Sequence, residues 1–335
     1  MKTFQKPIIE NSGLSSLGNE VDVLISPYES DVPVIVKPKT TLDVKDWVTR
    51  FRNEIDQALN NYGAILFRGF EISNASEFND FFSTLIGKPV EYTNQSSPRK
   101  KVFENVYTST SYPKDQKINL HTENSYSRNF IRIITFYCQI PAVAGGETPI
   151  ADERKLLKHL IKRNMIAKFR TMQIQYVRNI TTGAGLDWKT VYQTDNKEKV
   201  NEILRRDKIS FEWISEDHLR LKWVLPALHF HPILKEEVWF NHMFFYHKSR
   251  YPPEVIEYFD EEDLPFASYY GNGSVIESSV IEEIKQFYEE NSISFKWEKN
   301  DILLLDNLRF SHGRNSYEGE RSVLTAMSDP IRYEG

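Results

Sequence analysis

The stretch Leu-Leu-Leu-Asp-Asn-Leu-Arg-Phe-Ser-His-Gly-Arg, residues 303–314, runs from an apolar strand directly into a histidine. Earlier in the chain, Leu-His-Thr-Glu at residues 120–123 precedes another strand-like segment. Residues i and i+2 of an extended backbone point to the same face, so His121 and Glu123 can bind one metal ion together. Two imidazoles and one carboxylate on one side of an iron ion form the facial triad of non-haem Fe(II) oxygenases, and His312 would supply the second imidazole.

The His-x-Glu triplet alone is weak evidence, because such triplets occur by chance in most chains of this length. His229 and His231 form a rival pair on strand-like sequence, with no acidic partner nearby in the pattern. His242 and His247 are five residues apart, a spacing that places them on no common helical face. We interpret these four histidines as core or surface residues rather than metal ligands.

The composition excludes several classes of function. The chain has 335 residues, with 42 Lys and Arg against 47 Asp and Glu, which gives a formal net charge of −5. This balance lacks the basic excess typical of nucleic-acid binding. The single cysteine, Cys138, excludes an intrachain disulfide framework and a Cys-rich zinc site. No run of about 18 apolar residues could cross a membrane, and the N-terminus lacks the apolar core of a signal peptide, so we expect a cytoplasmic protein.

Hydrophobic periodicity predicts many short strands with helices at both ends. The four-residue spacing of Trp47, Phe51, Ile55 and Leu59 predicts an amphipathic helix. Further helices are expected around 78–85, 152–166 and 277–291, and strands at 63–70, 131–138, 169–177, 219–225, 238–240, 293–297, 301–305 and 321–327. This order favours a strand core with helical decoration over an alternating βαβ fold, and the composition marks no domain boundary.

Two further elements accompany the candidate triad. Gly-Gly-Glu-Thr at residues 145–148 follows Glu123, and Arg321 follows His312 into a strand. A guanidinium can hold a carboxylate through two parallel hydrogen bonds, and the Thr148 hydroxyl could donate to the same carboxylate. Alternatively, Arg321 pairs with a surface glutamate such as Glu318 or Glu320.

Six short segments, in this order, together resemble the taurine dioxygenase superfamily of Fe(II)- and 2-oxoglutarate-dependent oxygenases. They are residues 63–70 (GAILFRGF), His121-x-Glu123, 145–148 (GGET), 238–241 (VWFN), His312-x-Arg314 and Arg321. The resemblance covers about residues 60–330. It implies a mainly β fold with flanking helices and a double-stranded β-helix, or jelly-roll, core. It also implies one domain over residues 1–335, with a helical insertion at about 250–292.

The resemblance also implies roles for single residues. His121, Glu123 and His312 would bind Fe(II), and Thr148 and Arg321 would bind the C5 carboxylate of 2-oxoglutarate. O2 would be the oxidant, with release of succinate and CO2. Arg314 would support the site from behind, and the candidate substrate residues are Asn119, Asn241 and Thr325.

Two departures from the common family pattern bear on the substrate. Glu123 stands where most members have Asp, and Glu is found in clavaminate synthase and in amino-acid hydroxylases. A carboxylate at this position argues against the halogenase variant. Thr325 occupies the position of a second arginine that grips the sulfonate in taurine dioxygenase, and by the spacing it shares a strand face with Arg321, so a sulfonate substrate is disfavoured.

Residues 107–113 and 121–126 resemble the subgroup that hydroxylates amino acids during nonribosomal peptide and related secondary-metabolite synthesis. The implied substrate is a small amino-acid-like molecule, free or presented by a carrier protein, for which Arg99-Lys100-Lys101 offers a local basic patch. Desaturation, epoxidation and cyclisation remain alternatives to hydroxylation. Two other classes also remain, a catalytically silent jelly-roll binding protein and a zinc hydrolase built on the same triad.

Overall fold

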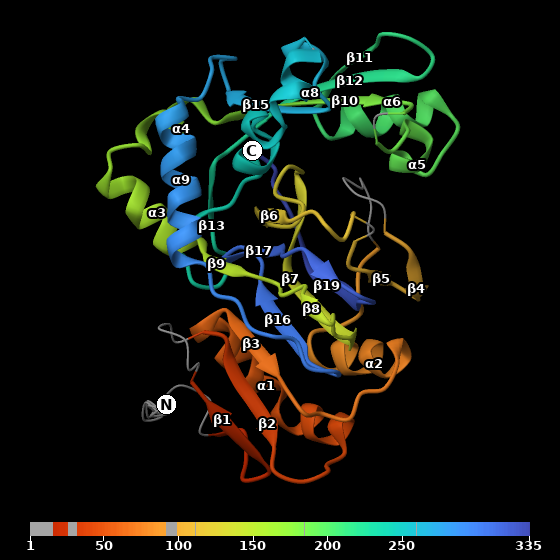
Figure 1. Cartoon of the computed structure of the whole chain (residues 1–335), viewed down its shortest axis with the longest axis vertical. Helices are drawn as coiled ribbons and strands as arrows, with labels where there is room; N and C mark the ends of the chain where they lie inside the picture. Colours follow the sequence, from red (N-terminus) through yellow and green to blue (C-terminus); the bar gives the residue numbers. More distant parts are fainter. Residues whose placement is uncertain (1–15, 26–31, 92–98, 111, 184, 259) are drawn as a thin grey trace.

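The computed structural model describes residues 16–25, 32–91, 99–110, 112–183, 185–258 and 260–335. Its largest sheet has eight strands in the order β1-β2-β3-β16-β7-β19-β5-β4. Their bounds are β1 Val21–Leu24, β2 Val34–Pro38, β3 Ala64–Phe67, β4 Lys101–Phe103, β5 Val106–Thr108, β7 Asn129–Ile140, β16 Ile302–Asp306 and β19 Ser322–Arg332. Figure 1 shows β16, β7 and β19 at the centre of the molecule.

Strand β16 is the hydrophobic centre of this sheet. All five of its residues are buried, and it pairs antiparallel with both β3 and β7. Successive side chains point to opposite faces of a strand. Leu304 accordingly packs in the cluster formed with the first two helices, whereas Leu303 and Leu305 pack on the other face with Phe310 and Ile150. The apolar run in the sequence therefore reflects a strand that is covered on both faces.

The first predicted helix is confirmed as α1 (Val44–Tyr62), which covers one face of the sheet with α2 (Ala75–Leu85). The Asp43 side chain accepts a hydrogen bond from the Asp46 N–H and caps the start of α1. Gly63 ends it with φ of 78°, where the N–H donates to the Leu59 carbonyl at 2.7 Å. A side chain at this position would collide with Phe310, 2.5 Å away, so glycine is required.

A three-stranded sheet lies against the opposite face of the main sheet. It consists of β6 (Ile118–His121), β17 (Phe310–Arg314) and β9 (Ile150–Asp152), with β17 in the middle. The register places His312 directly opposite His121 on β6 and opposite Ile150 on β9. Two candidate ligands that are far apart in the sequence thereby become cross-strand neighbours.

The remaining strands build a second sheet in the order β11-β12-β10-β15, towards the top of Figure 1. The bounds of these strands are β10 Ile174–Thr181, β11 Ser210–Trp213, β12 His218–Leu225 and β15 Phe266–Tyr270. The helices beside them are α3 Glu153–Lys162, α4 Ala167–Met172, α5 Trp188–Tyr192, α6 Lys197–Arg206, α7 Met243–Tyr246, α8 Pro253–Tyr258 and α9 Ser278–Asn291, with 3-10 turns at Lys248–Arg250 and Glu261–Asp263. Two-stranded ribbons join β13 (Leu228–Phe230) to β14 (Glu237–Trp239), and β8 (Ala144–Gly145) to β18 (Tyr317–Glu318).

The strand core flanked by helices is confirmed, but two local predictions are wrong. Residues 169–172 belong to α4, because Phe169 and Met172 follow a helical spacing, and the strand begins only at Ile174. Residues 293–297 form no strand apart from a bridge between Ile293 and Ile150. Their alternating burial reflects Phe295 and Trp297 inserting into the core, without a neighbouring strand.

The segment 250–292, predicted as a helical insertion, also contains a strand. β15 pairs antiparallel with β10 and extends the second sheet, between α8 and α9. Its Phe-Ala-Ser-Tyr-Tyr sequence is rich in aromatic residues that favour strands.

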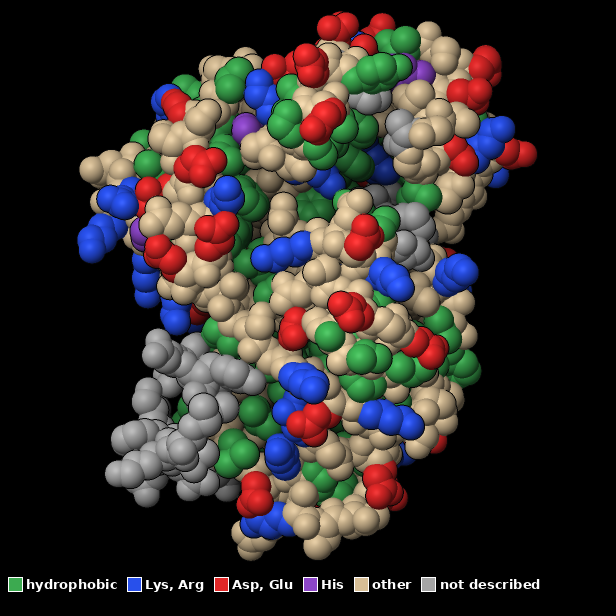
Figure 2. All heavy atoms as spheres, in the orientation of Figure 1, with side chains coloured by type: hydrophobic (Ala, Val, Ile, Leu, Met, Phe, Trp, Pro, Cys, Tyr) green, Lys and Arg blue, Asp and Glu red, His purple; other side chains and the backbone are tan. Residues whose placement is uncertain are grey.

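The molecule's exterior agrees with the composition. On the face shown in Figure 2, acidic and basic side chains are interspersed. Among the described residues, no helix combines the length and apolar character needed to cross a membrane.

Helices α3 and α9 lie side by side and share a buried carboxyl group (Figure 1). The Tyr288 hydroxyl of α9 donates to Glu153 of α3 at 3.0 Å, and Glu153 is only 1% exposed. Burial raises the pKa of Glu153 from 4.5 to about 8. The folded protein therefore keeps a proton here at neutral pH that the unfolded chain releases.

The free energy of unfolding should consequently fall as the pH rises from about 4.5 to about 8, and then level off at this site. Replacing Glu153→Gln removes the titrating group and keeps an acceptor for Tyr288. Above pH 8 the variant should exceed wild type in stability by roughly 1–3 kcal/mol, and the difference should vanish near pH 4. Urea unfolding across this range measures the effect, with the exposed Glu282→Gln as the matched control. A pH-independent difference between the Glu153→Gln variant and wild type would contradict the assignment.

Candidate active site

The three predicted metal ligands come together at the junction of β6 and β17. One ligand atom each from His121, Glu123 and His312 lies within 4.8 Å of the other two. The His312 Nε2 is 3.9 Å from the Glu123 Oε2, and the two imidazole rings have centroids 4.7 Å apart. Glu123 and His312 are 2% and 4% exposed. This buried set of two imidazoles and one carboxylate fits a divalent first-row metal such as iron.

Hydrogen bonding and burial prepare both imidazoles for a metal. The His121 Nδ1–H donates to the Asn119 carbonyl at 2.9 Å, which leaves Nε2 as the free lone pair. Desolvation lowers the pKa of His121, against the opposing effect of Glu123. Desolvation, with the neighbouring His121 and Arg99, holds the pKa of His312 well below its usual value. Both rings are therefore neutral at neutral pH, which is the form that binds metal.

A fully buried asparagine fixes the backbone of Glu123. The Asn307 Oδ1 accepts from the Glu123 N–H at 2.7 Å, and the Asn307 Nδ2 donates to the Glu123 carbonyl at 2.9 Å and to the Ile131 carbonyl at 2.8 Å. Asn307 lies in the turn between β16 and β17, five residues before His312. The same short stretch thus supplies one candidate metal ligand, His312, and the amide that fixes the backbone of another, Glu123.

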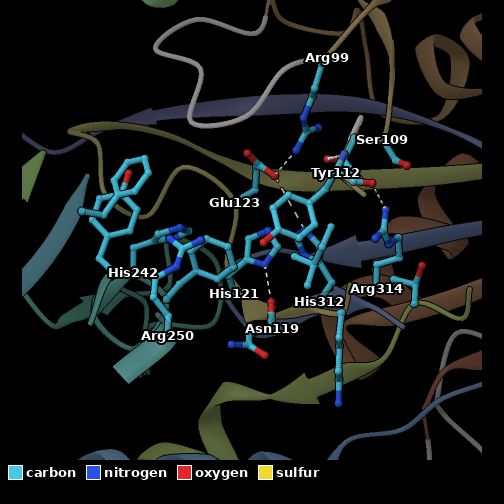
Figure 3. A pocket seen from close by; sticks show the side chains of 18 of the residues that line it. Arg99, Ser109, Tyr112, Asn119, His121, Glu123, His242, Arg250, His312 and Arg314 are labelled. Atoms are coloured by element: carbon cyan, nitrogen blue, oxygen red, sulfur yellow. Dashed lines mark hydrogen bonds and ion pairs between the residues drawn. The ribbon is translucent and has the colours of Figure 1, made fainter. Parts of the chain in front are cut away.

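The carboxylate of Glu123 is paired with Arg99. The Arg99 Nη2 is 2.6 Å from the Glu123 Oε2, and the side chains are 5% and 3% exposed (Figure 3). A buried carboxylate requires such a partner to offset its desolvation. Arg99 therefore points inward and does not contribute to the local basic patch considered at residues 99–101.

A cavity of about 490 Å³ opens beside the triad, and both predicted co-substrate residues line it. The Arg321 Nε donates to the Gly146 carbonyl at 2.9 Å, and no described carboxylate lies within 4.0 Å of the guanidinium. The alternative pairing with Glu318 or Glu320 is not formed. Burial lowers the pKa of Arg321 to about 10, so it remains a cation at neutral pH.

Thr148 and Gly146 form the surroundings of Arg321 in the cavity. Thr148 is 3% exposed, and its hydroxyl accepts a hydrogen bond from the Trp297 Nε1 at 3.2 Å. That hydroxyl keeps its own proton for a ligand. Gly146 has φ of 73°, and an added side chain would meet the Arg321 Cδ at 3.0 Å. Glycine here permits the close approach of the arginine.

Arg314 supports the cavity wall. Its guanidinium donates to the backbone carbonyls of Tyr112, at 2.9 Å, Pro113, and Gln116, at 2.6 Å. These contacts fix the loop that precedes β6, the strand that contains Asn119. Arg314 thus acts on a backbone segment beside the cavity, which is compatible with the supporting role implied by the sequence.

Comparisons with known proteins agree with this geometry. The model of the family described as "Taurine catabolism dioxygenase TauD, TfdA family" matches residues 29–327. The chain belongs to the TauD/TfdA family. The dapdiamide synthesis protein DdaC of Enterobacter agglomerans is 36% identical over 281 residues, covering 83% of this chain and 85% of DdaC. A clavaminate synthase-like protein of Arabidopsis thaliana is 26% identical over 324 residues, covering 91% of this chain and 92% of the relative.

Among solved structures, PvcB from Pseudomonas aeruginosa superposes with a TM-score of 0.56 at 11% identity, covering 99% of this chain and 98% of PvcB. PvcB is described as an Fe, alpha-ketoglutarate dependent oxygenase from an isonitrile synthetic pathway. The likeness confirms the jelly-roll fold, and the family match confirms the oxygenase class that the sequence resemblance implies.

Two of the three candidate substrate residues do not reach the cavity of this TauD/TfdA protein. Asn119 lines the cavity. Asn241 does not, and its side-chain Nδ2 donates a hydrogen bond to the backbone carbonyl of Ala227 at 2.9 Å. Thr325 is fully buried in β19 and lies outside the lining. The register shift between Ser322 and Val323 places its extra residue, Gln139, in β7, so β19 keeps its own alternation. That Thr325 shares a strand face with Arg321 therefore stays a prediction.

The four histidines that we interpreted as core or surface residues lie in different places, and only His242 lines the cavity. His242 lines the cavity, and its Nδ1 lies 3.1 Å from the Ser125 hydroxyl and 3.2 Å from the Thr122 carbonyl. His231 is buried in the core, and its Nε2 lies 2.7 Å from the Oδ2 of Asp306, an acidic partner 75 residues along the chain that the local sequence pattern does not show. His229 and His247 lie outside the cavity lining. None of the four belongs to the described metal cluster.

Sequence reasoning missed Asn307 and the wall residues Phe245 and Arg250. The apolar strand that ends in Asp306-Asn307 is a usable signal, since a buried polar residue before the ligand histidine needs a partner. Arg250 carries no signal in the sequence, because nothing in the pattern of residues 245–251 shows that this segment lines the same cavity as the distant triad.

Replacing Asn307→Ala should weaken metal binding about 10- to 100-fold, because the backbone of Glu123 loses its clamp. Anaerobic Fe(II) titration or Mn(II) binding followed by electron paramagnetic resonance measures the affinity. Asn291→Ala is the matched control, since the Asn291 amide also donates to a backbone carbonyl, at 2.9 Å, but on α9. A folded Asn307→Ala variant with wild-type metal affinity would show that the clamp is not needed.

Proposed function

We propose that this TauD/TfdA protein is an Fe(II)- and 2-oxoglutarate-dependent oxygenase that hydroxylates an unactivated C–H bond of an amino acid or an amino-acid-derived substrate in secondary metabolism. The observation that carries the proposal is the joint presence, in one cavity, of a buried His-Glu-His group and a cation without an acidic partner among the described residues. A metal site alone would not need Arg321.

Each residue has a defined task in this proposal. His121, Glu123 and His312 hold Fe(II) on one side and leave the cavity side for ligands. Arg321 and Thr148 bind and orient the far carboxylate of 2-oxoglutarate, which fixes its other end at the metal. When bound, iron and 2-oxoglutarate supply the oxidising chemistry from O2, with succinate and CO2 as by-products. The cavity walls position the target C–H bond and limit access of water.

The relatives support the substrate class. DdaC is a dapdiamide synthesis protein, and PvcB belongs to an isonitrile synthetic pathway. Both descriptions indicate secondary metabolism. The 490 Å³ cavity accommodates a small molecule of amino-acid size beside 2-oxoglutarate. The substrate is free or carrier-presented, and we place the protein in the cytoplasm as one domain organised around this site.

Two rival functions are less well supported. A zinc hydrolase would use the triad but has no task for Arg321 and Thr148. A silent binding protein would have no reason to hold two neutral imidazoles and a carboxylate within 4.8 Å. Desaturation, epoxidation and cyclisation use the same cavity, and the mass of the product distinguishes them from hydroxylation.

Replacing His121→Ala should abolish substrate-dependent succinate formation and the visible absorption that develops when Fe(II) and 2-oxoglutarate bind together without O2. The variant loses one of three ligands, so iron affinity should fall by at least about 10-fold. His159→Ala, which removes a histidine between α3 and α9, should keep both signals. The substrate screen uses free amino acids and the same amino acids loaded on carrier domains.

Replacing Arg321→Gln should raise the apparent Kd for 2-oxoglutarate about 10- to 100-fold with Fe(II) binding unchanged, because a charged pair to the C5 carboxylate is lost. Anaerobic titration of the visible absorption measures this affinity. The surface variant Arg163→Gln, which loses only an exposed pair with Glu283, is the control. Wild-type 2-oxoglutarate affinity in the Arg321→Gln variant would remove Arg321 from the co-substrate site.

A further inference from the structure

The cavity carries more positive charge than the metal and 2-oxoglutarate account for. Among its described lining residues Glu123 is the only acid, against five cationic side chains, namely Arg99, Lys117, Arg250, Arg314 and Arg321. Arg99 contacts Glu123, Arg314 binds loop carbonyls, and Arg321 serves the co-substrate. Lys117 is exposed to solvent, so its charge is hydrated. Neither the metal site nor the co-substrate site assigns a role to Arg250, the remaining cationic side chain of this group.

Aromatic rings hold the Arg250 side chain in place. Its guanidinium carbon lies 4.5 Å from the ring centroid of Phe245, 5.4 Å from that of Tyr251 and 5.6 Å from that of Phe266. The faces of aromatic rings attract a cation but accept no strong hydrogen bond from it. The rings therefore position the guanidinium and leave its donors available.

No described residue satisfies those donors. The Arg250 Nη1 is buried without a hydrogen-bond partner, and no described carboxylate lies within 4.0 Å of the guanidinium. A buried donor without an acceptor is costly, and the cost is relieved when an anion binds. Arg250 differs in this respect from Arg314, whose guanidinium is engaged with three carbonyls.

Arg250 is separated from the triad by one aromatic ring, that of Phe245. The Phe245 ring that it covers also contacts His121, with ring centroids 4.7 Å apart. Figure 3 shows Arg250 on the side of His121 that bears His242, whereas Arg99 and Arg314 lie at other edges of the group. A molecule bound by Arg250 would extend along Phe245 towards the metal ligands.

We propose that Arg250 binds a carboxylate of the substrate and that the enzyme selects substrates with a free carboxylate at the end away from the oxidised carbon. The inference rests on the proposed function and specifies its substrate. A planar guanidinium matches a carboxylate through two parallel hydrogen bonds. An amino acid joined to a carrier through its α-carboxyl group lacks this anion. Free amino acids, or carrier-bound acyl groups with a second carboxylate, satisfy the site.

The test compares two probes of equal size that differ in charge, hexanoate and hexanamide. Isothermal titration follows their binding to the full chain loaded with Mn(II) and N-oxalylglycine, which occupies the Arg321 site. Wild type should bind hexanoate about 10- to 100-fold more tightly than hexanamide. Arg250→Gln should abolish this preference, and Arg250→Lys should retain part of it. Lys117→Gln removes one charge from the same cavity and should leave the preference intact.

Two results would overturn the inference. One is equal or undetectable binding of hexanoate and hexanamide by wild type. The other is a preference for hexanoate that survives in Arg250→Gln, or that is lost equally in Lys117→Gln, because the field of the cavity and not Arg250 would then be responsible. The thermal midpoint and the Mn(II) affinity of each variant check that the fold and the triad are intact.

Turnover supplies an independent measurement. For any amino acid that supports succinate release, Arg250→Gln should raise KM about 10- to 100-fold with a smaller change in kcat, and should narrow the difference between the acid and its carboxamide. Failure of the proposed function is recognised separately. Wild type would then show no visible absorption with Fe(II) and 2-oxoglutarate. Normal absorption without carboxylate preference would overturn the role of Arg250 alone.

Discussion

The pairing of β17 with β6 is the constraint on which the site depends. It sets His312 opposite His121 and thereby brings two imidazoles to one point. A shift of one residue in this pairing would turn one of the two side chains to the opposite face. The register is held from outside the strands, by Asn307, whose amide binds both the N–H and the carbonyl of Glu123. The backbone thus determines the ligand geometry before any metal is present.

Most of the charged side chains that line the cavity beside the triad have an identifiable contact. The only acid in the described lining of the cavity is Glu123, a candidate metal ligand, and its negative charge is offset by Arg99. The three remaining arginines have different surroundings. Arg314 binds the carbonyls of a loop, Arg321 faces the proposed co-substrate site, and Arg250 is held by aromatic rings. A cavity of this kind favours anionic small molecules and disfavours cationic ones, because an added positive charge meets five cationic side chains against the single carboxylate of Glu123.

The parts of the site that the sequence predicts are those with local geometry. His121 and Glu123 follow from the alternation of a strand, and the helix at residues 44–62 follows from the spacing of its apolar side chains. Thr148 and Arg321 follow only from the family resemblance and its order of motifs. The strand prediction at 293–297 fails because alternation reports burial and not pairing. Asn307 and Arg99 could not be placed, since their partners lie in other segments of the chain, 24 residues away for Arg99 and 184 residues away for Asn307. Arg250 has ring neighbours nearby in the sequence, Phe245 and Tyr251, but no pattern places them beside the triad.

The long sequence separation between Glu123 and the segment of Asn307 and His312 also determines when the candidate ligands become available during translation. His121 and Glu123 leave the ribosome long before β16 and β17 exist, so the nascent chain has an incomplete set of ligands for most of its translation. Only when the last strands pair does the third ligand arrive, together with the amide that fixes Glu123. Long-range pairing of this kind closes late and slowly. The complete set of three candidate ligands therefore exists only after β17 has paired with β6, and a metal ion that requires all three selects the folded chain.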